Sequence, residues 1–304
     1  MRMGYACIVT ELNDLPKNQR VTTNRSMIKK TFTSKGVDYA SEMALLNCRD
    51  LMKILIWNSQ NQFDFFRMSS NMFPWASEYN ISDLKHFEEI ASVLKECGDF
   101  AKDNDIRLSF HPGPFNKLCS SDERILKNTI KDLETHGEIM DLMGLSRTHF
   151  NKINIHVGGA YGDRQKASEV FCRNFDKLSD SVKSRLTVEN DDRASLYSTK
   201  DLFSMIYEKI GVPIVHDIHH HGFCTGGIGQ EEAMKIAIST WGKITPVVHY
   251  SESRTKEYEN VKENAHSDYI YEKIECFDLD VDIMVEAKKK EKAVQKYRKD
   301  HLSS

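Results

Sequence analysis

Short apolar runs alternate with amphipathic stretches along the whole of this 304-residue chain, and this alternation limits the folds available to it. Eight runs are rich in β-branched residues and have the length of strands. They span residues 3–9, 63–68, 106–111, 153–157, 186–189, 214–217, 247–250 and 281–286. Between them, apolar residues recur at three- and four-residue steps, which is typical of helices. The predicted helices cover residues 84–102, 122–143, 166–182, 199–209 and 231–240.

Eight strands that alternate with helices predict a single (β/α)8 TIM barrel over residues 1–304, with a C-terminal helix at about 287–300. An open, doubly wound sheet is the alternative, and it is disfavoured because no Gly-x-Gly-x-x-Gly turn follows the first strand. Loops 11–33 and 251–266 are longer than usual βα connections, which favours lids or binding arms at the C-terminal rim. Candidate helix caps are Ser82-Asp83, Ser120-Ser121-Asp122 and Ser198-Thr199.

The composition is that of a soluble globular chain, with 40% apolar and 29% charged residues. No stretch of roughly 18 uncharged apolar residues could span a membrane. The first residues lack the layout of a signal peptide. The seven cysteines are dispersed without a C-x-x-C pair, which favours free thiols in a reducing compartment. We therefore expect an intracellular, soluble protein.

The net charge of −3 neither favours nor excludes a nucleic-acid partner, because DNA affinity depends on the local lysines and arginines that meet phosphates. One basic run extends from Lys288 to Lys299. It alternates with Glu291 and with apolar residues, so we interpret it as the solvated face of a helix.

Six successive predicted strands carry a histidine, an aspartate or a glutamate as their last residue or the one before it. These residues are His111, His156, Glu189, Asp217, His249 and Glu286. The C-terminal ends of barrel strands meet at one rim, where the active sites of such barrels are built. Taken alone, His111 is more typical of a core histidine than of a ligand, and in the run His219-His220-His221 only His220 is expected to face the site. The set of six is much more specific than any member.

A divalent metal centre explains this convergence best. Clustered carboxylates alone would repel one another and take up protons, and clustered neutral histidines would gain nothing from their proximity. Mixed sets of His, Asp and Glu bind manganese or zinc, and a carboxylate such as Glu189 can bridge two ions. Ions about 4 Å apart stabilise the attacking and leaving oxygens in phosphoester displacement.

Ten strings along the chain carry a family resemblance. They are Met3-Gly4-Tyr5-Ala6-Cys7, Thr22-Thr23-Asn24-Arg25, Phe66-Arg67-Met68-Ser69-Ser70, Ser109-Phe110-His111-Pro112-Gly113, His156-Val157-Gly158-Gly159, Glu189-Asn190-Asp191-Asp192, Asp217-Ile218-His219-His220, His249-Tyr250-Ser251, His266-Ser267-Asp268-Tyr269 and Glu286-Ala287-Lys288. In this order, from residue 2 to about residue 295, they resemble the UV damage endonuclease family. The resemblance implies a TIM barrel that cuts DNA immediately 5′ to cyclobutane pyrimidine dimers and 6-4 photoproducts. The cut needs no ATP and leaves a 3′-hydroxyl and a 5′-phosphate.

The resemblance also implies two or three divalent ions per chain, with manganese expected first and zinc, magnesium or cobalt as alternatives. His111 and His156 would hold one ion with Glu189, and Glu189 would bridge to a second ion. Further metal ligands would be Asp217, His249 and Glu286 for the second ion, and His220 and His266 for a third. Glu189, His111, His249 and Glu286 are the expected catalytic residues. The expected contacts to DNA or to the lesion are Tyr5, Asn24, Arg25, Arg67, Ser69, Pro114 and Phe115.

Three positions depart from the family pattern. Pro114 stands where the family usually has a glutamine, before the aromatic Phe115 that would wedge into the duplex. Val247 replaces a lysine that commonly precedes the strand-seven histidine, and Val9 replaces an asparagine. These changes bear on lesion preference and on the third ion.

We expect UV-damaged double-stranded DNA as the partner of a monomeric enzyme. Two alternatives stay open. An apurinic-site endonuclease or a sugar isomerase could use the same barrel and rim, although an isomerase would not need the long loops or an exposed Phe115. A damage-binding protein that no longer cuts is the second alternative, motivated by Pro114 and Val247.

Overall fold

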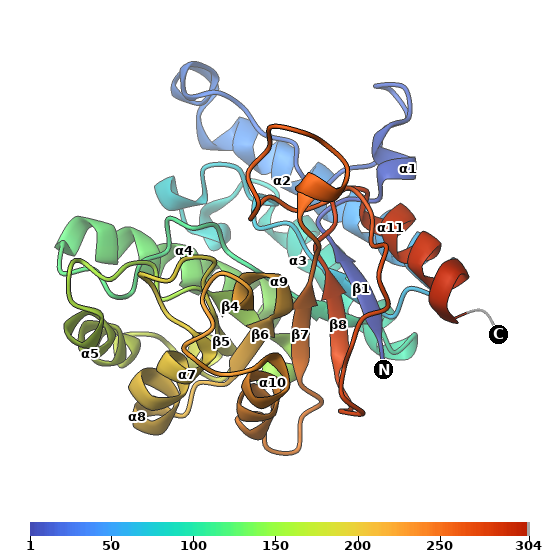
Figure 1. The fold of residues 1–304 in the computed structure, drawn as a ribbon. Coiled ribbons are helices and arrows are strands. Elements are labelled where there is room, and N and C mark those ends of the chain that lie inside the picture. The colour runs from blue at the N-terminus through green and yellow to red at the C-terminus, as the bar shows by residue number, and fades with distance from the viewer. Residues whose placement is uncertain (303–304) are drawn as a thin grey trace.

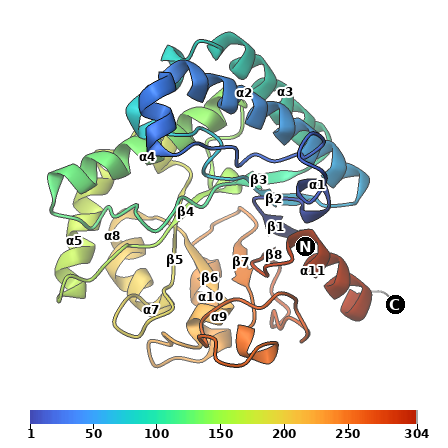
Figure 2. The same ribbon diagram turned by 90° about the horizontal axis from the view of Figure 1, so that it is seen from above.

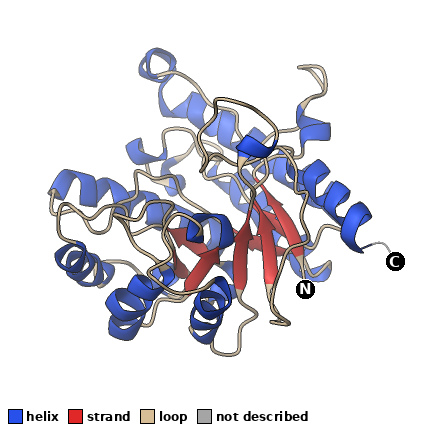
Figure 3. Cartoon of the chain, viewed as in Figure 1, coloured by secondary structure: helices blue, strands red, loops and turns tan. Residues whose placement is uncertain are grey.

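The computed structural model describes residues 1–302 of the chain and contains eight strands, all of them parallel. They lie at the centre of the molecule with helices around them (Figures 1 and 3). The strands are β1 (Met3–Ala6), β2 (Phe65–Arg67), β3 (Arg107–Ser109), β4 (Ile153–Ile155), β5 (Leu186–Glu189), β6 (Ile214–Asp217), β7 (Val247–Tyr250) and β8 (Asp282–Val285). Their order in the sheet is β3-β2-β1-β8-β7-β6-β5-β4.

The two edge strands of this sheet meet and close the barrel. Phe110 and Ile153 form a parallel bridge, in which the Phe110 amide donates to the Lys152 carbonyl and the Asn154 amide donates to the Phe110 carbonyl, at 2.9 and 3.0 Å. The view from above shows the helices around this ring of strands (Figure 2). The prediction of a TIM barrel is thus confirmed, and the open, doubly wound alternative is wrong.

The helices follow the predicted pattern with three differences. They are α1 (Thr10–Asn13), α2 (Lys29–Gln60), α3 (Phe87–Asp103), α4 (Glu123–Leu142), α5 (Arg164–Phe175), α6 (Asp180–Lys183), α7 (Thr199–Leu202), α8 (Glu208–Ile210), α9 (Ile218–His221), α10 (Gln230–Ser239) and α11 (Lys290–Tyr297). The sequence analysis missed α1, α2 and α9, so the predicted loop 11–33 begins within α1 and ends at Ile28, five residues earlier than expected. The helix predicted over 166–182 is two helices, and a π-helical turn, Phe203–Tyr207, interrupts the one predicted over 199–209.

The predicted caps are confirmed at two of three places. The Asp122 carboxylate accepts hydrogen bonds from the first amides of α4, and the Ser198 hydroxyl accepts one at the start of α7. Ser82 and Asp83 instead lie inside a 3-10 turn, Ile81–Asp83, and α3 begins after His86 without a side-chain cap. The cap prediction there was wrong because the polar pair forms its own turn four residues before the helix.

The barrel interior is built in layers, because alternate residues of each strand point inward. At the bottom, the buried Arg107 guanidinium lies 2.8 Å from the Asp282 carboxylate. The next layer is an apolar cluster. Its buried members are Ala6, Phe65, Val215, Trp241, Val247 and Met284. The residues that follow in the same inward phase, such as Asp217 after Val215 and His249 after Val247, therefore reach the upper rim.

The last helix docks against the first. Glu291 on α11 is fully buried, and its carboxylate accepts hydrogen bonds from the Thr10 and Glu11 amides at the start of α1, at 2.9 and 3.0 Å. The interpretation of the basic run as a solvated helix face is correct for Lys292, which is exposed on α11, and wrong for Glu291; Lys288 and Lys289 are exposed but precede the helix.

All seven cysteines are free, as the sequence analysis expected. Within residues 1–302, no helix combines the length and hydropathy that crossing a membrane requires.

Candidate metal centre

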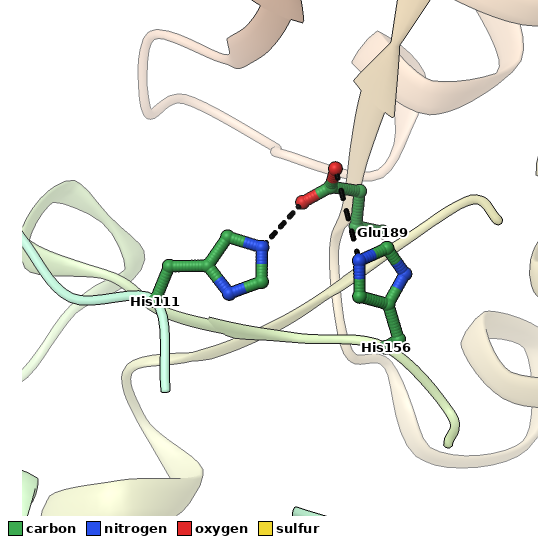
Figure 4. Close-up of side chains that lie close together, drawn as sticks. All are labelled: His111, His156 and Glu189. Carbon is green, nitrogen blue, oxygen red and sulfur yellow. Dashed lines mark hydrogen bonds and ion pairs between the residues drawn. The ribbon is translucent and has the colours of Figure 1, made fainter. Parts of the chain in front are cut away.

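Glu189, the last residue of β5, lies at the centre of the upper rim and has no exposed surface. One carboxylate oxygen, Oε2, lies 3.0 Å from His111 Nε2 and 3.0 Å from His249 Nδ1. The other, Oε1, lies 3.4 Å from His220 Nδ1 and 4.0 Å from His156 Nε2. Figure 4 shows His111 and His156 pointing at this carboxylate from two sides. Four histidines, two from the loops after β3 and β4, one from α9 and one from β7, thus surround one buried carboxylate.

The ligand atoms form three groups in which all atoms lie within 4.8 Å of one another. The groups are His111 with His156 and Glu189, His111 with His249 and Glu286, and Glu189 with Asp217 and His249. The six residues predicted from the strand ends are therefore brought together. Because Glu189 and His249 each belong to two groups, the arrangement suits neighbouring ions that share ligands.

Several of these atoms are buried without a hydrogen-bond partner among residues 1–302. They are Glu189 Oε1, Asp217 Oδ2, His156 Nδ1 and His249 Nδ1. An unsatisfied buried carboxylate oxygen is costly, and native structures rarely leave one without reason. A cation that accepts carboxylate oxygen and imidazole nitrogen would satisfy these atoms. The donor set therefore fits a divalent metal such as manganese or zinc.

The two residues predicted for a third ion lie at the edge of this cluster. The ring centroids of His220 and His266 are 6.0 Å apart. His220 Nδ1 is hydrogen-bonded to the Asn190 carbonyl at 3.0 Å, and His266 Nδ1 to the Glu286 carbonyl at 3.1 Å. Both rings thus have one nitrogen held by the backbone, which leaves their Nε2 atoms for another ligand.

The cluster perturbs the ionisation of its members in opposite directions. Burial lowers the pKa of His111 to about 4 despite the neighbouring Glu189. For His156, burial is outweighed by Glu189 and Asp191, which raise its pKa to about 10. His220 has its pKa raised to about 9 because Asp217 and Glu189 outweigh its burial.

The two glutamates stay ionised. Burial favours their neutral forms. The histidines around Glu189, His249 first, outweigh its burial and hold its pKa well below the usual range. Arg67 and then His249 do the same for the pKa of Glu286. Arg67, at the end of β2, makes an ion pair with Glu286, and both side chains are largely buried. Arg67 therefore orients a ligand carboxylate, in addition to its predicted place at the rim.

The sequence analysis missed three residues that support the ligands. Asn154 donates a hydrogen bond to Glu189, Asp191 lies 3.3 Å from His156 Nδ1, and Lys152 lies 3.2 Å from His249 Nε2. Burial lowers the pKa of the Lys152 amine to about 7. Lys152 and Asn154 precede His156 at two-residue steps, so the strand period would have indicated that they share its inward face.

Some of the residues predicted to contact DNA are exposed, and others are hydrogen-bonded to neighbouring residues of the protein. Phe115 is 87% exposed, and Pro114 beside it is exposed as well. The Ser69 hydroxyl donates to the Asn24 amide oxygen, which joins the loops after β1 and β2. The Arg25 guanidinium is held by Asp50 and by the Thr22 carbonyl, at 2.5 and 2.6 Å, so it shapes its own loop.

Tyr5 does not reach the open rim in this structure. Its ring is fully buried against Phe63 and Phe66, and its hydroxyl donates to Asn58 on α2. The reason is its phase on β1: Ala6 points into the barrel, so Tyr5 points toward the helices.

Val9 and Val247, two positions that depart from the family pattern, are buried apolar residues. A cavity of about 470 Å³ adjoins the cluster between the loops after β3, β4 and β5. Its lining includes His156, His220, Asp191, Pro114 and Lys117. The cluster therefore opens toward the loop that carries Phe115.

Comparison with known proteins shows the family of the chain. Residues 1–304 match the family described as UV-endonuclease UvdE. The chain is 34% identical to the UV-damage endonuclease of Schizosaccharomyces pombe, over 96% of this chain and 49% of the relative. It is 35% identical to the UV DNA damage endonuclease of Clostridium perfringens, over 96% of this chain and 68% of the relative. The chain thus spans about half of the first relative and two thirds of the second.

A solved structure extends the comparison to the fold. The crystal structure of SacUVDE superposes with a TM-score of 0.83 at 30% identity, over 98% of both chains. The chain belongs to the UV-endonuclease UvdE family, a family of endonucleases. A D-tagatose 3-epimerase-like protein also superposes, with a TM-score of 0.54, but at 15% identity it shares the barrel fold alone.

Proposed function

We propose that this chain hydrolyses the phosphodiester bond immediately 5′ to UV photoproducts in double-stranded DNA. Cyclobutane pyrimidine dimers and 6-4 photoproducts are the proposed lesions, and the products are a 3′-hydroxyl and a 5′-phosphate. The reaction uses two or three divalent metal ions and no ATP. The observation that carries this proposal is the cluster around buried Glu189, in a chain of the UvdE family.

The proposed ligand residues include carboxylates, whose negative charge would hold the divalent ions used in phosphate hydrolysis. His111, His156, Glu189, Asp217, His249 and Glu286 would hold the ions, with His220 and His266 at the edge. Divalent ions bound there would stabilise the attacking and leaving oxygens of the phosphate. Glu189 and Glu286 remain carboxylates, because their pKa values lie well below the usual range. Arg67 fixes Glu286 through their ion pair, so the carboxylate faces the cluster in a defined position.

Recognition of the lesion falls to the rim loops. A photoproduct weakens stacking and pairing, so bending the duplex and extruding the lesion cost less there than in intact DNA. Phe115 is exposed on the loop after β3, next to the cavity that reaches His156. An exposed aromatic ring at this place can wedge between bases, as apolar side chains do when they kink DNA. Pro114 makes that loop stiffer than a glutamine would, and it offers no amide to the opposing bases.

A nicking assay tests the proposal directly. The substrate is a duplex oligonucleotide with a single cyclobutane thymine dimer and a label at its 5′ end. We expect a cut just 5′ to the dimer when manganese is present and no cut in EDTA. A parallel duplex with one abasic site separates the alternatives: preferential cutting of that substrate would replace the proposed activity with an apurinic-site endonuclease. Binding without any cut would indicate a damage-binding protein.

Replacing Phe115 with alanine should weaken lesion discrimination. The ring is 87% exposed, so its loss should leave the fold unchanged and remove stacking energy of about 1–3 kcal/mol. The measurement is the ratio of cleavage rates on damaged and undamaged duplexes. The control is Ile56→Ala, which removes an exposed apolar side chain near the C-terminal end of α2. An unchanged ratio for Phe115→Ala would remove the wedge from the proposal.

A further inference from the structure

A lysine lies inside the barrel, below the candidate metal centre. Lys152 immediately precedes β4 and has no exposed surface. Its side chain shares the inward face with Asn154 and His156, which follow at two-residue steps. A hydrogen bond joins Lys152 Nζ to His249 Nε2 at 3.2 Å. Among residues 1–302, no other hydrogen bond or ion pair engages this amine.

The orientation of the His249 ring matters to the centre because this ring faces both glutamates. Its Nδ1 lies 3.0 Å from Glu189 Oε2 and 3.1 Å from Glu286 Oε1, and within residues 1–302 this atom has no hydrogen-bond partner. Nδ1 is therefore the ligand atom, and Nε2 is the atom that points down to Lys152. His249 also belongs to two of the three ligand groups, so a turned ring would disturb both.

We propose that Lys152 is a positioning residue that fixes the His249 ring, so that its Nδ1 faces the bound ions. The proposal rests on the metal centre put forward above. Metal-binding histidines usually have their second nitrogen held by a hydrogen bond, which sets the orientation of the ring. The usual partners are a carboxylate, a backbone carbonyl or a water. Here the partner is the amine of a lysine from a strand three positions away in the barrel order.

Stability alone does not account for a lysine at this place. A buried amine loses its hydration, and one hydrogen bond to a histidine replaces little of it. An apolar side chain of similar shape is often as stable or more stable in such a position. On this proposal Lys152 lowers the stability of the metal-free fold and raises its affinity for the metal.

The variant Lys152→Met separates these two effects. Methionine keeps most of the volume and removes the hydrogen bond. We expect the manganese Kd of the purified apoprotein, followed by electron paramagnetic resonance of free manganese, to rise about 10- to 100-fold. We expect the melting temperature of the same protein in EDTA to stay equal or to rise. A merely structural role would lower the melting temperature and leave the Kd unchanged.

Two further variants sharpen the test. Lys152→Gln places a polar amide one atom short of the lysine nitrogen, and its manganese Kd should lie between those of the wild type and Lys152→Met. Arg185→Met removes another fully buried basic side chain, one that contacts Asp141 and the Leu145 and Ser146 carbonyls away from the metal ligands. It should lower the melting temperature and leave the manganese Kd unchanged.

The outcomes distinguish this inference from the proposed function. If the wild-type protein binds no manganese, the metal centre itself is overturned. If the wild type binds and both Lys152 variants bind equally well, the positioning role is overturned while the centre stands. If Lys152→Met does not fold, the Lys152→Gln titration decides: a raised Kd supports the role, and a Kd equal to that of the wild type overturns it.

Discussion

Replacing Glu189 with glutamine should abolish strand cleavage and leave binding to damaged DNA largely intact. The substitution keeps the size of the side chain and removes the charge that faces four histidines. When residues act as one catalytic unit, loss of one member removes most of the unit's effect, so we expect the rate to fall by at least about a thousandfold. DNA binding should persist because Glu189 has no exposed surface and so cannot contact the DNA itself. The rate comes from the nicking assay and the affinity from a gel shift.

The matched control for this variant is Glu252→Gln. Glu252 is also buried, but it accepts hydrogen bonds from the Tyr271 and Glu272 amides and belongs to none of the three ligand groups. Its cleavage rate should stay within a few-fold of the wild type. Unchanged cleavage by Glu189→Gln would remove the bridging role from this residue. Loss of DNA binding together with cleavage would point to damage to the fold, which circular dichroism would reveal.

The affinity for manganese should rise steeply with pH. His156 and His220 have their pKa values raised to about 10 and about 9, so each carries a proton at neutral pH when no metal is bound. A metal must displace both protons, and each one makes the apparent affinity change by about tenfold per pH unit below these pKa values. His111 adds no such term near neutral pH, because its pKa of about 4 leaves it neutral. Manganese titrations at pH 7 and 8, without oxygen, would measure the slope.

The same protons determine how the stability of the metal-free protein depends on pH. For both histidines the folded-state pKa lies above the value of about 6.5 in an unfolded chain. Their contribution is therefore complete below about pH 6.5 and is lost as the pH rises through about 9 to 10. The depressed pKa values of Glu189 and Glu286 act at the other end, since their contribution is lost as the pH falls through those values. Melting temperatures in EDTA would show this pattern, and His156→Gln should remove part of the alkaline loss.

Much of the fold was predictable because the strands are buried and short. Strands β5, β6 and β7 have the predicted ends, since a polar residue follows a β-branched run in each: Glu189 and Asp217 end β5 and β6, and His249 is the residue before the end of β7. Helix α2 was not predicted, because its first turns are polar and exposed and because Gly36, with a φ of 69°, lies between two helical segments. A kink of this kind breaks the periodicity on which a helix prediction depends.

Part of the candidate site could likewise be predicted from the sequence, and part could not. The convergence of the six proposed ligands could be predicted because they lie at or near the C-terminal ends of strands, where a barrel places its active site. Asn154, Asp191 and Lys152 support the ligands through contacts between strands that are far apart in sequence, and only the closed barrel brings them together. Tyr5 was expected to contact the DNA or the lesion because of the family resemblance. The side to which it points depends on the phase of β1, which the resemblance does not supply, and its hydroxyl donates to Asn58.

The contact between α11 and α1 has a consequence for synthesis of the chain. The amides of Thr10 and Glu11 are synthesised about 280 residues before their buried partner Glu291. Translation proceeds from the N-terminus at about 5–20 residues per second, so the first helix waits some tens of seconds for this partner. The α1 contact, next to the loop that leads from β1 to Asn24 and Arg25, can therefore form only after Glu291 has left the ribosome. Until then, one side of the barrel rim stays without its support.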